Sequence, residues 1–169
     1  MQNGYLGIIK NQQNGTTKPT HLSISPDLKS TYYIFFIIGI SLLIHLVCIT
    51  SSVLLVEEAY YWNYAQHLDF SYLDHPPMVA LLIKLSTSLF GTTEFGVRII
   101  SLICWMFMAF FSYKLTELIS KGTGAYSLML LAILPFFFLH ALIITPDVPL
   151  IVCWSASLYC LYRALILNE

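Results

Sequence analysis

The chain has 169 residues, of which 57% are hydrophobic and only 10% are charged, and its formal net charge at pH 7 is −1. A soluble domain of this length has too little interior to bury so much apolar surface, so part of the chain must face lipid. The near-zero net charge gives no electrostatic basis for binding nucleic acid. The four cysteines lie inside apolar runs without Cys-x-x-Cys pairing, which is typical of small hydrophobic residues within helices.

The chain begins with a polar segment, residues 1–31, which is rich in Asn, Gln, Thr and Ser. We interpret it as a disordered cytoplasmic tail. Residues 32–169 are predicted to form one all-α membrane domain, because about 20 apolar residues are needed to cross the hydrocarbon core as a helix. Four segments meet that requirement, at about 32–55, 96–116, 124–144 and 147–167.

The connection between the first two spans, residues 56–95, is predicted to be an outer loop. It starts with an amphipathic stretch, turns at Pro76-Pro77 and ends in the apolar run 78–90. That run is short and has Lys84 near its middle, which favours an interfacial or re-entrant helix over a span. Further along, Pro135 is expected to bend the third span, and Pro146 to open the fourth at its first turn.

The distribution of basic residues predicts the orientation. With four spans and a cytoplasmic N-terminus, six of the eight Lys and Arg residues lie inside: Lys10, Lys18, Lys29, Lys114, Lys121 and Arg163. Counting 78–90 as a fifth span would remove this bias, so the positive-inside rule favours four. The outer loop and the turn before the fourth span then share the non-cytoplasmic side. We therefore expect an integral protein of a bacterial inner (plasma) membrane, with its acidic loop outside.

Glu57 and Glu58 follow the first span directly. They have a structural interpretation, because acids near a helix N-terminus are stabilised by the helix dipole. The functional interpretation makes one of them a general base that removes a proton from an acceptor. Since adjacent residues point about 100° apart on a helix, at most one of the two can aim into a central cavity.

Tyr60 and Tyr61 belong to an aromatic cluster in the same loop. Such residues commonly anchor a helix at the headgroup level. They also share helix faces with Tyr64 and Glu57 respectively, at i, i+4 spacing. Aromatic rings beside an acid are common where sugars stack, so lining a substrate site is the second interpretation.

The sequence Asp74-His75-Pro76-Pro77 fixes the backbone before the next helix, so the side chains of Asp74 and His75 are held in place. His75 could donate a hydrogen bond to a phosphate, although a solvated histidine in a plain turn is the alternative. Arg98 lies just inside the second span, where a cation is costly unless it is paired or faces a polar cavity; snorkelling outward and binding an anionic headgroup both remain open.

Asp147 stands at the start of the fourth span, within Thr145-Pro146-Asp147-Val148-Pro149. It can serve as a neighbour of the helix N-cap. It is also predicted to lie on the same side of the membrane as Glu57 and Glu58. These three carboxylates could hold a divalent metal together with water, although nothing in the sequence requires one.

Taken together, these motifs resemble the first outer loop of family-39-type glycosyltransferases. These are C-type (GT-C) membrane enzymes that include protein mannosyltransferases and lipid A aminoarabinose transferases. The resemblance rests on three motifs in order, within residues 57–150: Glu-Glu-Ala-Tyr-Tyr, a Pro-Pro pair preceded by histidine, and Thr-Pro-Asp-Val-Pro-Leu.

The resemblance implies transfer of a sugar from a polyprenyl-phosphate donor at the non-cytoplasmic face, by direct displacement with inversion. It implies catalytic roles for Glu57, Glu58 and Asp147, with Glu57 as the base. It implies that His75 approaches the donor phosphate, and Arg98 is assigned to the same anion. Tyr60, Tyr61 and Asp74 are then expected to line the substrate site.

Two features depart from the family pattern. Glu57 stands where the family more often has Asp, and a displacement of about 1 Å can cost about 100-fold in rate. The chain also carries four spans, whereas family members have many more. We therefore expect an N-terminal part of such an enzyme that is not competent alone.

Two other functions compete with this one. The first is a non-catalytic membrane protein that binds lipid-linked sugar or a partner subunit. The second is a small transporter, which is disfavoured because the spans lack the deep acids expected of a cation path.

Overall fold

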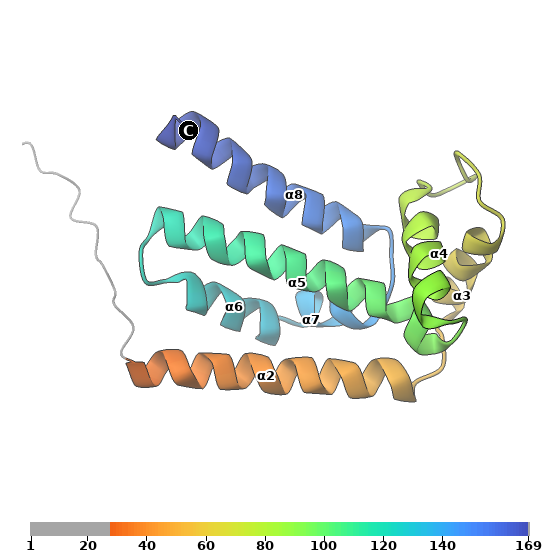
Figure 1. The fold of residues 1–169 in the computed structure, drawn as a ribbon, viewed down its shortest axis with the longest axis horizontal. Coiled ribbons are helices and arrows are strands. Elements are labelled where there is room, and N and C mark those ends of the chain that lie inside the picture. The colour runs from red at the N-terminus through yellow and green to blue at the C-terminus, as the bar shows by residue number, and fades with distance from the viewer. Residues whose placement is uncertain (1–27, 169) are drawn as a thin grey trace, which may run out of the picture.

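The structure is a computed structural model, and it describes residues 28–168. The described residues form helices joined by loops and contain no strand (Figure 1). Seven α-helices and a final π-helical turn follow one another along the chain: α2 Leu28–Ser51, α3 Val56–Gln66, α4 Met78–Phe90, α5 Glu94–Ile119, α6 Gly124–Ile133, α7 Pro135–Leu142, α8 Asp147–Tyr162 and η1 Arg163–Leu167.

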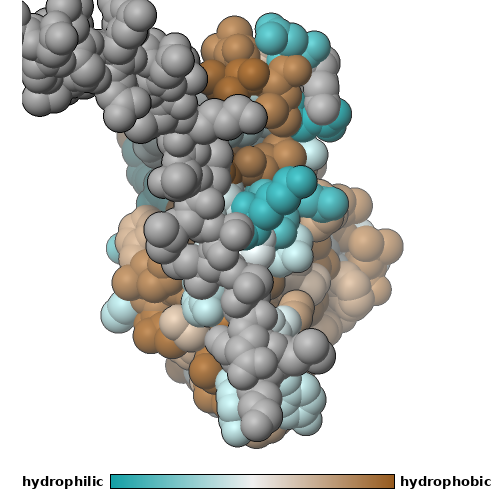
Figure 2. All heavy atoms as spheres, turned by 90° about the vertical axis from the view of Figure 1, so that its left-hand side faces the viewer, coloured by the Kyte–Doolittle hydropathy of each residue, from teal (hydrophilic) through white to brown (hydrophobic). Residues whose placement is uncertain are grey.

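The long helices α2, α5 and α8 run roughly side by side, with α6 and α7 between α2 and α5 (Figure 1). Helices α2 and α5 and the continuous run Asp147–Leu167 are long and apolar enough to cross a membrane. The predicted all-α membrane fold is therefore confirmed. Seen from the end where α5 turns into α6, hydrophobic residues surround the bundle and hydrophilic ones gather toward the viewer (Figure 2).

The predicted third span is broken. Helices α6 and α7 meet at an angle of 72°, so they form either one bent span or a re-entrant pair. The break falls at Leu134, whose extended backbone (φ −65°, ψ 123°) precedes Pro135. A residue before proline is pushed out of the helical region, and proline fits the first turn of a new helix. The bend expected at Pro135 is thus confirmed. It is so sharp that only three of the four predicted spans are unbroken helices in the described residues.

Two boundaries differ from the prediction. Helix α2 already includes residues 28–31, which were assigned to the tail; the rest of that predicted tail lies outside the described residues. The same helix ends at Ser51, four residues before the predicted end. The early end leaves the carbonyl groups of Ser52 and Val53 free to bind a side chain of α5.

Helices α3 and α4 cap one end of the bundle, and α4 runs across the direction of the long helices (Figure 1). The α4–α5 turn is tight: Gly91 adopts φ 85°, and a Cβ atom on Gly96 would lie 1.9 Å from the Gly91 carbonyl oxygen. Ser86 donates a 2.6 Å hydrogen bond to the Gly96 carbonyl across the same turn. This packing fixes the start of α5 against α4.

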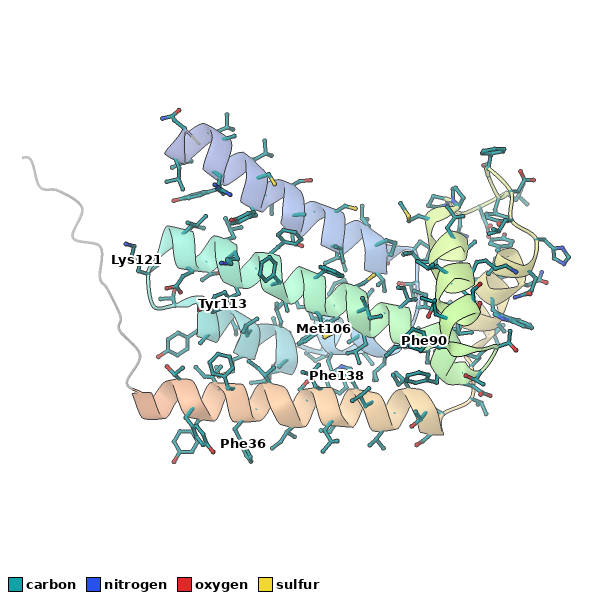
Figure 3. The ribbon with its side chains drawn as sticks, in the orientation of Figure 1. Phe36, Phe90, Met106, Tyr113, Lys121 and Phe138 are labelled. Atoms are coloured by element: carbon teal, nitrogen blue, oxygen red, sulfur yellow. The ribbon has the colours of Figure 1, made fainter. Side chains whose placement is uncertain are left out.

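Most of the described acidic residues lie at the end of the bundle that α3 and α4 cap, together with Lys84 and Arg98, whereas Glu117 lies near Lys121 at the other end. Lys121 lies at the end opposite Phe90, which marks the α4–α5 turn (Figure 3). Glu57, Glu58 and Asp74 belong to the cap of α3 and its following loop, and Asp147 begins α8 beside α7. This arrangement brings the sequence motifs of interest to one end of the bundle.

His45 joins the first span to the helix that follows the break. Its side chain is fully buried, its Nδ1 atom lies 2.6 Å from the Ser41 carbonyl oxygen and its Nε2 atom lies 3.0 Å from the Phe138 carbonyl oxygen. The ring also packs 4.2 Å from that of Phe138, on the side of α7 that faces α2 (Figure 3). His45 is thus a packed core residue that also holds α7 in place.

Replacing His45 with leucine keeps most of the packing volume and removes the polar contacts of both ring nitrogens with the two carbonyl oxygens. We expect the free energy of unfolding in detergent to fall by roughly 1–3 kcal/mol, the range for buried hydrogen bonds. Thr50→Val is the matched control, because the Thr50 hydroxyl is exposed and bonds only to carbonyls of its own helix. Equal thermal midpoints for the two variants would show that His45 does not hold the helices together.

Candidate active site

A buried ion pair joins α3 to α5 beneath the outer end of the bundle. Arg98 of α5 donates from Nε to Glu58 Oε1 (2.8 Å) and from Nη2 to Glu58 Oε2 (2.5 Å). Its Nη1 atom donates to the carbonyl and hydroxyl oxygens of Ser52 (2.7 and 2.6 Å), and Nη2 also donates to the Val53 carbonyl (2.8 Å). Each of the five N–H donors of a guanidinium therefore has an acceptor here.

The carboxylate oxygens of Glu58 likewise have all their acceptor positions filled. Besides the two bonds from Arg98, its carboxylate accepts from the backbone N–H of Leu55 (2.9 Å) and of Ile144 (3.3 Å). The Glu58 side chain is 0% exposed. Two charges can remain in such a place only when they are paired and fully hydrogen-bonded. The network ties the end of α2, the start of α3, α5 and the α7–α8 turn together.

This geometry changes the interpretation of two predicted site residues. Arg98 has no donor left for a phosphate, and Glu58 has no lone pair directed at a substrate. These contacts therefore do not support the predicted binding of a donor phosphate by Arg98. They also do not support a chemical role for Glu58. Both residues instead position the site above them. The sequence could not show this, because the two residues lie 40 positions apart.

Glu57 differs completely from its neighbour. Its carboxylate is exposed and makes no hydrogen bond or ion pair with any described residue. The two adjacent acids thus separate as helix geometry predicts, one into the core and one outward. Of the pair, Glu57 is the one free to act on a bound molecule.

Tyr61 lies within electrostatic range of three carboxylates. Its side chain is buried, with 6% of the residue exposed, and it packs in the same core cluster as Ile144 and Val148 from the start of α8. Burial raises the pKa of its hydroxyl, and the nearby charges of Glu57, Asp74 and Asp147 raise it further. Three carboxylates from three separate segments therefore act on one phenol.

His75 connects Tyr61 to Asp74. Its Nε2 atom lies 3.2 Å from the Tyr61 hydroxyl, and the two rings pack edge to face at 5.2 Å. Its Nδ1 atom lies 3.1 Å from Asp74 Oδ1, an ion-pair distance without the alignment of a hydrogen bond. The Pro76-Pro77 turn thus places His75 at the site, as its sequence context predicts.

A tyrosine cluster holds Asp74 in place. Tyr64 donates a 2.7 Å hydrogen bond to Asp74 Oδ1, and Tyr60 donates to Oδ2 at 3.2 Å. The Tyr64 ring stacks on Tyr72 at 3.9 Å, and the Tyr72 hydroxyl donates to the Tyr64 carbonyl. Sequence reasoning paired Tyr60 with Tyr64 but missed Tyr72, whose contribution depends on the loop folding back.

Asp147 lies at the first residue of α8 and is 62% exposed at its side chain. Its Oδ2 atom lies 3.8 Å from Nε2 of His140, a residue of α7 that sequence reasoning did not select. Nothing in the sequence pairs them, because α7 must end and turn before the two can approach. No group of three His, Cys, Asp or Glu residues within 28–168 is arranged to hold a metal ion.

Removing one partner of the Glu58–Arg98 pair should strongly destabilise this end of the bundle, because the other charge is left buried and unpaired. We expect Glu58→Leu and Arg98→Met each to lower the free energy of unfolding by roughly 3–5 kcal/mol, because each leaves one buried charge unpaired. The double variant should lose less than the sum of the two. Denaturant unfolding in detergent measures all three, and additive losses would show that the residues do not act as a pair.

The pKa of Asp74 is lowered, first by the hydrogen bond from Tyr64 and next by His75. Tyr64→Phe should therefore raise the pKa of Asp74 toward its usual range, which carbon-13 NMR of the carboxyl group would follow. A lowered carboxyl pKa stabilises the fold above the unfolded-state value, and that stabilisation is lost as the pH falls. Tyr33→Phe, far away on α2, is the control that should leave this titration unchanged.

Comparisons with known proteins place this geometry in context. The family described as dolichyl-phosphate-mannose-protein mannosyltransferase matches residues 74–169, more than half of the chain. The match includes His75, Arg98 and Asp147 and leaves out Glu57 and Glu58. An uncharacterized protein of Aquifex aeolicus (strain VF5) is 30% identical over 93 residues. That alignment covers 54% of this chain but 19% of the relative.

No solved structure matches the chain. The evidence for the family is thus the sequence match together with apolar helices that can span a membrane. On that evidence the chain belongs to the dolichyl-phosphate-mannose-protein mannosyltransferase family, whose members are membrane glycosyltransferases of the GT-C type.

Proposed function

We propose that the chain takes part in transferring a sugar from a polyprenyl-phosphate donor to an acceptor, at the non-cytoplasmic face of a bacterial inner membrane. The observation that carries the proposal is that Tyr61, in contact with His75, lies within electrostatic range of Glu57, Asp74 and Asp147, whose charges raise its pKa. The family match supports a lipid-linked donor of this class.

Glu57 is the proposed general base. It is the carboxylate of the two-glutamate motif that has no partner among the described residues, so it can accept a proton without breaking a structural contact. In the reaction, an acceptor hydroxyl or amine attacks the anomeric carbon and gives its proton to Glu57. The bond from that carbon to the phosphate oxygen breaks, the lipid phosphate leaves, and the configuration inverts.

His75 and Asp147 flank the proposed base. His75 is the imidazole held nearest to Tyr61, and when protonated it can pair with the phosphate that leaves. Asp147 is exposed at the first turn of α8, where it can orient the acceptor or the sugar. Tyr60 and Tyr61 line the same region, and Asp74 positions His75. The acceptor stays open, since no contact in this region selects one.

Transfer and donor binding together test the proposal. Membranes containing the chain would be given a radiolabelled polyprenyl-phosphate sugar, and both retention of the donor and turnover would be measured. We expect Glu57→Gln to lower turnover at least about 100-fold while leaving donor retention within about twofold. His75→Ala should instead weaken retention.

Glu94→Gln is the matched control, because Glu94 is an exposed acid in the first turn of α5, next to the same cap. It should behave like the parent chain. Donor retention with no turnover in the parent chain would fit both the binding protein and an enzyme part that is not competent alone. The proposal fails if the parent chain retains no donor, or if Glu94→Gln and Glu57→Gln have the same effect.

A further inference from the structure

The loop between α3 and α4 forms a hollow of about 270 Å³ with the first turn of α4. Leu68, Asp69 and Phe70 line it from the loop, and Pro77 and Leu81 line it from the start of α4. Since an apolar cavity of about 150 Å³ holds a benzene molecule, this hollow has room for roughly two five-carbon units. Four of its five lining residues are apolar, so it suits a hydrocarbon chain better than a sugar or a phosphate.

The walls of the hollow are held in place by contacts within the chain. The Tyr72 hydroxyl lies 2.9 Å from the Tyr64 carbonyl oxygen and 3.1 Å from that of His67, and it accepts a 3.2 Å hydrogen bond from the Asp69 N–H. On the other side, the ring of Pro77 restricts the backbone just before α4 begins. A ligand that enters therefore has little ordering of the loop to offset.

The apolar side chains of the hollow are unusually exposed. Phe70 is 98% exposed, and Leu68 and Leu81 are 47% and 49% exposed. Helix α4 crosses the direction of the long helices at the capped end of the bundle (Figure 1), and its exposed apolar row continues from Leu81 to Leu85 and Leu89. Contiguous exposed apolar surface of this kind marks a place where a ligand or lipid binds. The hollow thus lies at the level where the spans end.

The hollow is close to His75, the proposed partner of the donor phosphate. Two peptide units separate His75 from Pro77, so their Cα atoms are at most about 7 Å apart. In a prenyl phosphate the hydrocarbon chain begins one oxygen atom away from the phosphorus. A phosphate held at His75 therefore brings the first carbons of its chain within reach of Pro77 and Leu81. The Asp69 carboxylate at the rim repels the phosphate itself, so the chain is the part that enters.

We propose that this hollow binds the isoprene units nearest the phosphate of a prenyl-phosphate donor. The inference rests on the proposed function, in which a lipid-linked donor binds with its phosphate at His75. It goes beyond that function because it names the side chains that hold the donor's hydrocarbon: Leu68, Phe70, Pro77 and Leu81. The α3–α4 loop then contributes to the affinity for the lipid part of the donor, apart from any role in chemistry.

Photolabelling of the full chain in nanodiscs locates the bound chain. The probe is geranyl phosphate, which has two isoprene units, with a diazirine on its hydrocarbon; mass spectrometry identifies the labelled peptides. We expect the label within residues 68–81, and we expect unlabelled geranyl phosphate to displace it. Geraniol, which lacks the phosphate, should displace the probe at least about tenfold less well, because it makes no charge-assisted hydrogen bond.

Variants of the lining test the role of the hollow in affinity. Phe70→Ser and Leu81→Gln remove apolar lining without opening a core, because both side chains are exposed. We expect each to weaken geranyl phosphate binding at least about fivefold, and to leave binding of methyl phosphate, which has no chain, within about twofold. Leu85→Gln is the matched control, since Leu85 is a similarly exposed leucine of the same row that does not line the hollow.

The outcomes separate this inference from the proposed function. Label confined to other residues, with geranyl phosphate still bound, overturns the hollow and leaves the donor class standing. Displacement by geraniol as effective as by geranyl phosphate means that lipid or another apolar molecule occupies the hollow, which also overturns the inference. So does a loss of affinity in Leu85→Gln equal to that in Leu81→Gln. If geranyl phosphate neither binds nor labels the chain, the donor class in the proposed function is wrong as well.

Discussion

The end of the bundle that α3 and α4 cap depends on one buried ion pair. Arg98 and Glu58 neutralise each other inside the bundle, and their remaining donors and acceptors bind backbone groups from three other segments. A buried pair of this kind contributes little net stability compared with apolar packing, but it is specific, because a misplaced partner leaves a charge unpaired. It therefore fixes where α2 ends, where α3 begins and where the α7–α8 turn lies.

The Glu58–Arg98 pair explains why the neighbouring residues Glu57 and Glu58 point in different directions. Helical geometry sends Glu58 inward to Arg98, and it then sends Glu57 outward toward the region around Tyr61. The same pair holds the Ile144 N–H, three residues before Asp147. The Glu58–Arg98 ion pair thus sets the distance between Glu57 and Asp147, although neither of these two residues takes part in it.

The cap formed by α3, α4 and their connection is stiff for a segment outside the spans. Stacked tyrosines and the Pro76-Pro77 turn hold Asp74 and His75, and the glycine turn at 91–96 locks α4 to α5. Preorganised polar groups of this kind suit charge that develops in a transition state, because they need not rearrange during the reaction. The same preorganisation also suits tight binding of a ligand without chemistry.

The sequence by itself determined the membrane class, the bend at Pro135 and the motifs at 57–58, 74–77 and 145–149. These follow from local quantities: hydropathy over a helix length, the backbone limits of proline, and the residue types within a short motif. Only the tertiary structure decided that Arg98 serves Glu58 and not a phosphate, that Tyr72 supports Tyr64, and that His140 meets Asp147. Each of these depends on helices packing from distant parts of the chain, and a side chain's role changes once its hydrogen-bonding capacity is filled.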